Sequence, residues 1–273
     1  MLRGLLLGTV LVGTGCSVGT TELPRPGICA PFELIDLTPA DRAVGVSIDA
    51  PSVFTFTDFP EPNTANAQNF GIFSGPYYYT AHQSVDLIGR SIRFKTTSSL
   101  PSGLEFSLQL SPRVASLRGC PLAPPPATPD GKAQTNYYFS FRTAEPGADV
   151  PAPPPPPAAA TYQDFLGVAA AHCAGGCHLG PPAGPDATGD CLAAPAGGLS
   201  LCATQAYANL TGVSSHQVSR LAIVAARDSA RSYLLRKLLG APPLTGHTGP
   251  PGDALSEAEL RLIQSWIDNG AIP

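Results

Sequence analysis

Residues 172–180, HCAGGCHLG, place two histidines and two cysteines within nine positions. Thiols and imidazoles bind transition metals, and paired thiols also form disulfides or carry a covalently attached cofactor. The spacing here is CxxxCH, one residue longer than the CxxCH motif of covalent haem attachment. On a helix, positions three and four apart diverge by only about 40–60°, so the thiols of Cys173 and Cys177 still share one side. His178 directly follows the second cysteine, and the motif is therefore compatible with haem attachment.

The elements that must position this motif are predicted to be helices. Residues 161–173 lead directly into it, and residues 228–240 form a second apolar run that ends at Gly240. In the closing segment DALSEAELRLIQSWIDNGAIP, Ser256 and Glu259 have the spacing of a capping box, and apolar residues recur on one face after it. The half of the chain that carries the motif is thus predicted to be mainly helical.

Five segments carry a resemblance to a known family: FLGVAAAHCAGGCH, AGGLSL, AYANLTGV, RSYLLRKLLG and PPGDALSEAELRLIQSWIDNGA. Together they make residues 161–273 resemble the class I type cytochrome c domains of exported bacterial proteins. The resemblance implies haem c as the cofactor, with thioether bonds to Cys173 and Cys177. It also implies that His178 binds the iron.

The residue expected as the second iron ligand differs from the one that this family usually has. The family usually has a methionine just before a Pro-Pro pair, whereas Met1 is the only methionine in this chain. His247 lies on the corresponding loop, GHTGPPGDALS, and is expected to take this place because neutral imidazole binds haem iron. His216 is the weaker candidate, and if neither histidine binds, the iron is five-coordinate.

Two other interpretations of the motif stay open. Cys173 and Cys177 form a disulfide if the domain keeps the cytochrome fold without haem. Alternatively, Cys173, Cys177, His178 and Cys191 have the ligand types of a zinc site, although free thiolates are uncommon in an oxidising compartment. His172 has no part in these interpretations and is expected to be a bystander.

The first half of the chain alternates between apolar and polar residues, which is typical of strands. Phe54 and Phe56 share one face of PSVFTFTDF, and every second residue from Leu104 to Leu110 is apolar. The segment NYYFSFRT repeats the pattern, and clusters of Pro, Gly, Asn and Asp separate these runs. Residues 32–145 are therefore predicted to be an antiparallel β-sandwich. The order of these segments resembles a bacterial Ig-like domain of the cell-surface type, which implies a spacer or an adhesive module.

The N-terminal residues MLRGLLLGTVLVGTGCS have the shape of an export signal, because one positive charge at Arg3 precedes an apolar run too short to cross a bilayer. The run ends at Cys16 in a context that resembles the lipobox of bacterial lipoproteins, so Cys16 is expected to carry a lipid anchor. Gly13 stands where the lipobox usually has leucine. Ordinary cleavage that leaves Cys16 an unmodified thiol is therefore the alternative.

Outside the cytoplasm, cysteines form disulfides. From their positions in the chain, Cys29 is expected to pair with Cys120, and Cys191 with Cys202. The proline run VPAPPPPPAAA at residues 150–160 cannot continue a helix or a sheet and is predicted to be a semi-rigid boundary.

The predicted fold class is a multidomain chain, with an all-β Ig-like sandwich followed by a mainly α cytochrome c-like domain. The predicted divisions are a signal peptide at 1–15, a tether at 16–31, the Ig-like sandwich at 32–145, a Pro-rich linker at 146–160 and the cytochrome c-like domain at 161–273.

Composition and motifs exclude several classes of function. The formal net charge of −4 does not favour nucleic acid as a partner. No HExxH, GxSxG or phosphate-binding Gly-rich motif indicates an enzyme. The chain is therefore expected to be a membrane-tethered haem protein, periplasmic or at the cell surface, that exchanges one electron with a redox protein partner. The alternative is a haem-free structural or adhesive surface lipoprotein whose degenerate cytochrome fold is held by disulfides.

Overall fold

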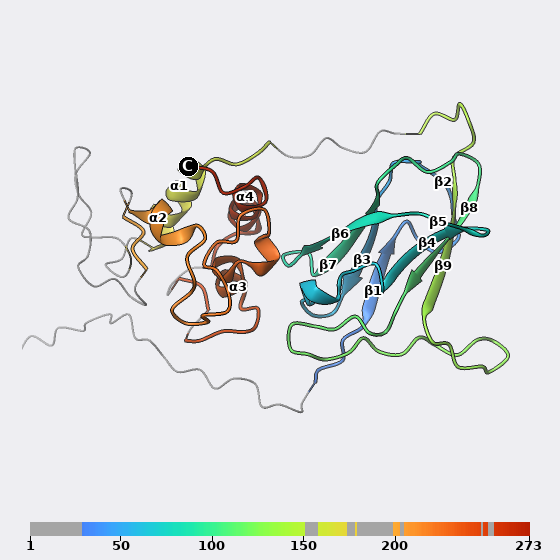
Figure 1. Cartoon of the computed structure of the whole chain (residues 1–273), viewed down its shortest axis with the longest axis horizontal. Coiled ribbons are helices and arrows are strands. Elements are labelled where there is room, and N and C mark those ends of the chain that lie inside the picture. The colour runs from blue at the N-terminus through green and yellow to red at the C-terminus, as the bar shows by residue number, and fades with distance from the viewer. Residues whose placement is uncertain are drawn as a thin grey trace, which may run out of the picture.

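The structure, a computed structural model, describes residues 29–150, 158–173, 178, 199–202, 205–246, 248–250 and 254–273. The first half is a sandwich of two β-sheets, and the α-helices lie in the second half (Figure 1). The strands are β1 (Leu34–Thr38), β2 (Ala43–Val46), β3 (Ser52–Phe56), β4 (Phe70–Ser74), β5 (Tyr77–Tyr78), β6 (Ala81–Asp86), β7 (Ser91–Thr96), β8 (Glu105–Leu110) and β9 (Tyr137–Thr143). A single turn of 3-10 helix, η1 (Pro62–Thr64), lies between β3 and β4.

One sheet has the strand order β1-β3-β7-β6 and the other has the order β2-β9-β8-β4-β5. Strands β2 and β9 pair in parallel, and the other pairs are antiparallel. The register places Phe54 opposite Ile92 in the first sheet, and Leu108 opposite both Ile72 and Phe139 in the second. Alternate residues of a strand point to opposite faces, so the apolar side chains of both sheets meet in one layer.

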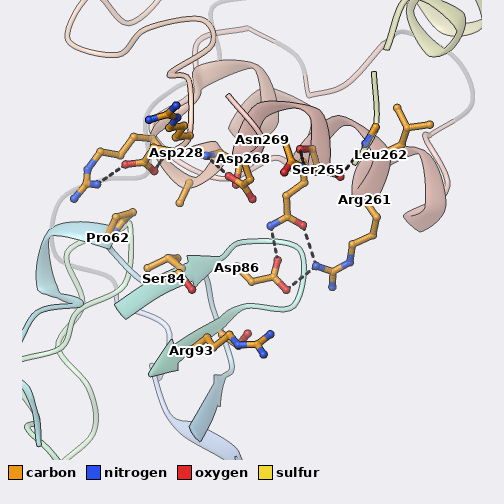
Figure 2. Close-up of a pocket in the computed structure, with 18 of the residues that line it drawn as sticks. Pro62, Ser84, Asp86, Arg93, Asp228, Arg261, Leu262, Ser265, Asp268 and Asn269 are labelled. Carbon is orange, nitrogen blue, oxygen red and sulfur yellow. Dashed lines mark hydrogen bonds and ion pairs between the residues drawn. The ribbon is translucent and has the colours of Figure 1, made fainter. Parts of the chain in front are cut away.

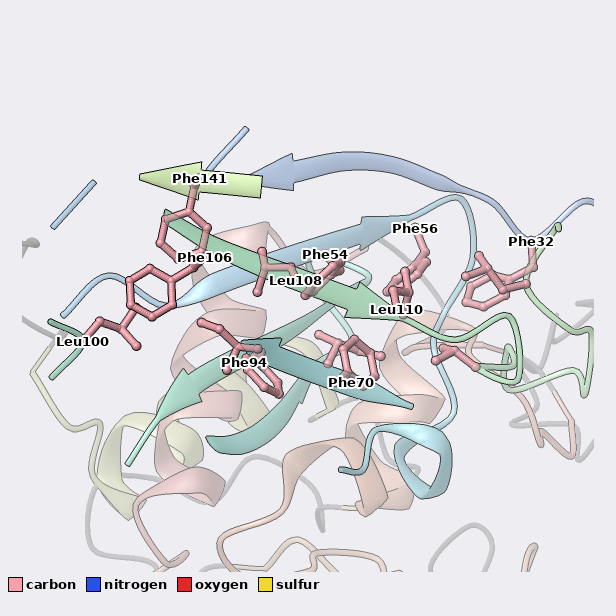
Figure 3. Packing of buried hydrophobic residues seen from close by; sticks show 14 of the residues in the cluster. Phe32, Phe54, Phe56, Phe70, Phe94, Leu100, Phe106, Leu108, Leu110 and Phe141 are labelled. Carbon is pink, nitrogen blue, oxygen red and sulfur yellow. The ribbon is translucent and has the colours of Figure 1, made fainter. Parts of the chain in front are cut away.

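Phenylalanine side chains fill most of this layer (Figure 3). Phe56 and Phe106 are fully buried, and the ring of Phe106 stacks on that of Phe141 with centroids 5.5 Å apart. Burying such a side chain stabilises a fold by roughly 1.5–3 kcal/mol, so this layer is the main source of the sandwich's stability. The predicted alternation is confirmed over residues 105–110, where every second side chain is buried. Leu104 is 44% exposed instead, because it precedes β8 and does not take part in its alternation.

A disulfide joins Cys29 to Cys120, with the two Cα atoms 5.5 Å apart, which is the pairing expected from the sequence. Cys120 is buried in the same core as the phenylalanines. Closing a loop over a sequence separation of 91 residues removes entropy from the unfolded chain. In the chain-entropy description this stabilises the fold by about 4–5 kcal/mol.

The second half contains short helices. They are α1 (Tyr162–Cys173), α2 (Ala206–Leu210), η3 (Ser229–Arg231), α3 (Tyr233–Leu239) and α4 (Glu257–Asp268). The capping box predicted at the start of α4 is present, because the hydroxyl of Ser256 accepts from the Glu259 amide and the Glu259 carboxylate accepts from the Ser256 amide. The predicted stop of α3 is also confirmed, since Gly240 adopts a left-handed conformation with φ of 70°.

Helices α1 and α4 pack around Trp266, the one tryptophan of the chain. The ring of Phe165 stacks on the indole with centroids 4.7 Å apart, and the Tyr162 ring lies 5.6 Å from it. The indole Nε1 donates a hydrogen bond to the carbonyl of Ile272 at 2.9 Å. The buried polar atom of Trp266 is therefore satisfied, and its apolar surface forms the centre of the second core.

The fold class predicted from the sequence is wrong for the chain as a whole. The described chain is mainly β, with nine strands in two sheets, and the second half is not the mainly α cytochrome c-like domain that was expected. In the described second half, only α1 and α4 reach 12 residues, whereas α2 has five and α3 seven. Residues 211–228 form turns and isolated bridges. The run predicted as one helix over residues 228–240 is divided at Ser232 into η3 and the seven-residue α3, and such short runs do not sustain long helices.

None of the helices in the described part of the chain is long and apolar enough to cross a membrane.

The sandwich and the helical half pack against each other at the turn between β6 and β7 (Figure 2). The carboxylate of Asp86, at the end of β6, accepts hydrogen bonds from Nη1 of Arg261 at 2.6 Å and Nε2 of Gln264 at 3.1 Å. The next residue, Leu87, is fully buried and shares an apolar cluster with Ala230 of the helical half. A cleft of about 1130 Å³ lies beside these contacts, lined by residues of β6, β7, η3 and α4.

Candidate functional site

Cys173 is the last residue of α1. This helix begins with a side-chain cap, because the carboxylate of Asp164 accepts hydrogen bonds from the amide and the hydroxyl of Thr161 at 2.8 and 2.7 Å. Phe165 and Ala169 face the second core, and Cys173 follows four residues later on the same face. Its thiol is free and half-buried. Burial raises the pKa of this thiol, so the protonated form predominates at neutral pH.

The imidazole of His178 is held in one orientation. Its Nδ1 lies 2.9 Å from the carbonyl oxygen of Leu199, and the carbonyl of His178 accepts a hydrogen bond from the amide of Leu201 at 2.9 Å. A carbonyl oxygen only accepts, so Nδ1 carries the proton and donates it. In the neutral imidazole, Nε2 then keeps its lone pair. Histidines that bind metals usually have this arrangement, with the other ring N–H given to a carbonyl or a carboxylate.

One apolar cluster connects the thiol and the imidazole. Cys173 and Leu199 both pack against the cluster around Trp266, and Leu201 is buried within it. The thiol and the segment that orients His178 therefore share one apolar wall.

The structure describes part of the predicted site. Cys173 and His178 are the two predicted attachment and ligand residues that it places. Four others lie outside the described residues: Cys16, Cys177, Cys191 and His247. Because Cys173 is a free thiol, it does not form the disulfide with Cys177 that was considered for a haem-free domain. Cys202 is disulfide-bonded, whereas its predicted partner Cys191 is not described, so that pairing stays a prediction.

Within the described ranges, no three or more His, Cys, Asp or Glu side chains are grouped closely enough to hold a metal ion. Of the four ligands considered for zinc, only Cys173 and His178 are described, so that interpretation is not tested. His216, the second candidate for the distal iron ligand, lies on an exposed bend.

His172, expected to be a bystander at the motif, makes a contact that the sequence did not indicate. Its Nε2 lies 2.8 Å from Oε1 of Glu259, at the start of α4. The pKa of the Glu259 carboxyl falls from 4.5 to about 2, first because the Ser256 hydroxyl donates to it and then because His172 does. Sequence reasoning missed this pair because 87 residues separate its members and no local pattern relates them.

Comparisons with known proteins give distant likenesses. No family model matches the chain, and no curated protein matches it. The crystal structure of the S-layer protein rSbsC(31-844) matches with 16% identity and a TM-score of 0.31, covering 45% of this chain and 14% of that chain. PcoC, a methionine-rich copper resistance protein from Escherichia coli, matches with 11% identity and a TM-score of 0.32, covering 42% of this chain and 99% of that chain. L,D-transpeptidase 1 from Mycobacterium tuberculosis matches with 19% identity and a TM-score of 0.26, covering 41% of this chain and 38% of that chain. With TM-scores this low, these likenesses carry no inference about function.

Proposed function

We propose that this protein is an exported, membrane-tethered one-electron carrier that binds haem c through Cys173, Cys177 and His178. The observation that carries the proposal is the hydrogen bond between Nδ1 of His178 and the carbonyl of Leu199, at 2.9 Å. This bond leaves Nε2 as the ring nitrogen with a lone pair, which is the atom that a metal binds.

The surroundings of Cys173 support the same proposal. A thioether forms only on an unpaired thiol, and the thiol of Cys173 is unpaired. The apolar cluster around Trp266 lies against this thiol and keeps water from that side of the site. Bound haem supplies a one-electron couple whose potential depends on its axial ligands and on its burial. The residues of this chain hold the thiol and the imidazole in place and supply the apolar surface.

The proposal is tested by producing the full chain in a bacterial host that has the c-type haem attachment machinery. We expect the purified wild type to keep a Soret absorption band after acid-acetone extraction. Cys173→Ala removes one of the two expected thioethers and should lower the haem content, and His178→Ala should remove the iron ligand and nearly all haem. His216→Ala is the matched control, because it removes an exposed imidazole from the same half of the chain. A wild type that binds no haem under these conditions would contradict the proposal.

His247 is proposed as the second axial ligand, on the sequence evidence alone. Replacing His247 with Ala in the haem-loaded protein should change a low-spin absorption spectrum to a high-spin one and allow carbon monoxide to bind the reduced iron. The control His216→Ala should leave both properties unchanged. A wild type that is already high-spin and binds carbon monoxide would exclude coordination by two histidines.

Cys16 is proposed as the site of the lipid anchor, and the anchor would place the protein in the periplasm or at the cell surface. Replacing Cys16 with Ser should move the protein from the membrane fraction to the soluble periplasmic fraction of the producing cells. If the variant stays with the membranes, the tether lies elsewhere.

A further inference from the structure

His172 precedes Cys173 and occupies the last turn of α1. Its imidazole Nε2 lies 2.8 Å from Oε1 of Glu259, which belongs to the first turn of α4. The two side chains are 19% and 31% exposed, so water competes only partly for this contact. The end of α1 that carries the thiol is therefore joined to the beginning of α4.

Glu259 is itself held in place. Its other carboxylate oxygen, Oε2, accepts from the amide of Ser256 at 2.8 Å and from the Ser256 hydroxyl at 2.7 Å. One oxygen thus serves the capping box and the other oxygen serves His172. A carboxylate fixed at one oxygen presents the second in a defined direction, so Glu259 orients the imidazole and does not merely attract it.

Two other contacts of the α1 segment with α4 lie toward the other end of α1. The amide of Ala160, just before α1, donates to Oγ of Ser265 at 3.2 Å. Phe165 stacks on Trp266 in the first turns of the helix. These contacts set how the two helices cross, but they lie two turns or more from Cys173. Among the described residues, the contact between His172 and Glu259 is a polar contact at the thiol-bearing end.

We propose that His172 is a positioning residue for Cys173: held by Glu259, it fixes the last turn of α1 so that the thiol stays against the apolar cluster around Trp266. The importance of this placement for cofactor attachment rests on the proposed function, whereas the placement itself does not. His172 touches neither the thiol nor a cofactor in this role, and it acts through the backbone of α1.

The test compares two replacements of His172 in the full chain, produced without haem attachment machinery. His172→Leu fits a helix but offers no hydrogen-bond donor, whereas the amide N–H of Gln in His172→Gln can still donate to Glu259. The readout is the rate at which a maleimide modifies Cys173, with the modified cysteine located by mass spectrometry. We expect Leu to raise this rate roughly tenfold, because a hydrogen bond to a charged group is lost, and Gln to restore the wild-type rate. The control Asp164→Ala removes the cap at the opposite end of α1 and should leave the rate nearly unchanged.

The same variants are then produced with haem attachment machinery, and the haem bound per protein is measured. His172→Leu should lower this ratio and His172→Gln should restore it. If the maleimide rate of His172→Leu equals that of the wild type, or if Asp164→Ala raises the rate as much, the positioning role is wrong, whether or not the wild type binds haem. If the wild type binds no haem while the maleimide rates behave as expected, the proposed function fails and the positioning of Cys173 stands.

Discussion

At the scale of single residues, the carboxylate of Glu259 makes two kinds of structural contact. It closes the capping box at the start of α4, and it holds His172 beside Cys173. The hydrogen bonds from Ser256 and His172 favour the charged form, which is why the pKa of this group lies near 2 instead of 4.5. A folded-state pKa below the unfolded value means that the ionised carboxylate stabilises the fold at pH values above 4.5, and that this stabilisation is lost as the pH falls toward 2.

The first prediction concerns the variant Glu259→Gln. Glutamine also serves in a capping box but does not titrate. The free energy of unfolding of the wild type should therefore fall more steeply than that of the variant as the pH is lowered from 4.5 to about 2. Urea unfolding at a series of pH values measures both curves. Parallel curves would show that Glu259 contributes nothing that depends on its charge.

At the scale of elements, local patterns predicted several boundaries correctly. Alternation identified β3, β8 and β9, the pair of Ser256 and Glu259 identified the start of α4, and Gly240 identified the end of α3. These signals act within a few residues, where propensity and capping decide the structure. The prediction of a mainly α second half was wrong because short apolar runs were interpreted as full helices. The run at residues 228–240 forms only η3 and the seven-residue α3, and isolated bridges hold residues 211–228.

The second prediction concerns two glycines that follow short helices. Gly240 after α3 and Gly212 after α2 both have left-handed conformations, with φ of 70° and 72°. Alanine at either position costs about 1–2 kcal/mol in backbone strain. At Gly240 the added methyl group would also lie 3.1 Å from Cγ2 of Thr248, whereas at Gly212 nothing lies within 4 Å. Gly240→Ala should therefore lower the free energy of unfolding more than Gly212→Ala does, as measured by urea unfolding. Equal losses would mean that the loop around Thr248 moves freely away from the helix end.

At the scale of the whole molecule, contacts between distant parts of the chain were not predictable. The residues of the pair Asp86 and Arg261 are 175 positions apart, and those of the pair His172 and Glu259 are 87 apart. Each of these side chains alone is an ordinary surface residue in the sequence. Their pairing depends on how the two cores meet, and periodicity carries no information about that. The proposed haem site was inferred from CxxxCH, whereas the orientation of His178 by Leu199 required the structure.

The third prediction concerns whether the sandwich and the helical half unfold together. Leu87 belongs to the sandwich but is fully buried in the cluster that contains Ala230. Leu87→Ala should cost about 2–5 kcal/mol and should lower the thermal midpoint of the helical half as well as that of the sandwich. Trp266 is the single tryptophan, so its fluorescence reports the helical half alone.

The control for this prediction is Leu104→Ala, which removes the same atoms from a half-exposed position of the sandwich. It should shift the fluorescence midpoint little. If Leu87→Ala leaves the Trp266 midpoint where it is in the wild type, the two halves unfold independently despite their contact.

The disulfide between Cys29 and Cys120 has a mechanical consequence. Strands β1 to β8 all lie between these two cysteines, so they sit inside a covalently closed loop. A pulling force that enters before Cys29 and leaves through the segment after β9 passes through the disulfide and not along those strands. The closed loop spans a separation of 91 residues. At ~3.3–3.6 Å per residue, the stretched chain therefore cannot gain the length of about 300 Å that these residues would add if they were fully extended. Under tension, only the residues after Cys120, β9 among them, can be drawn out of the sandwich.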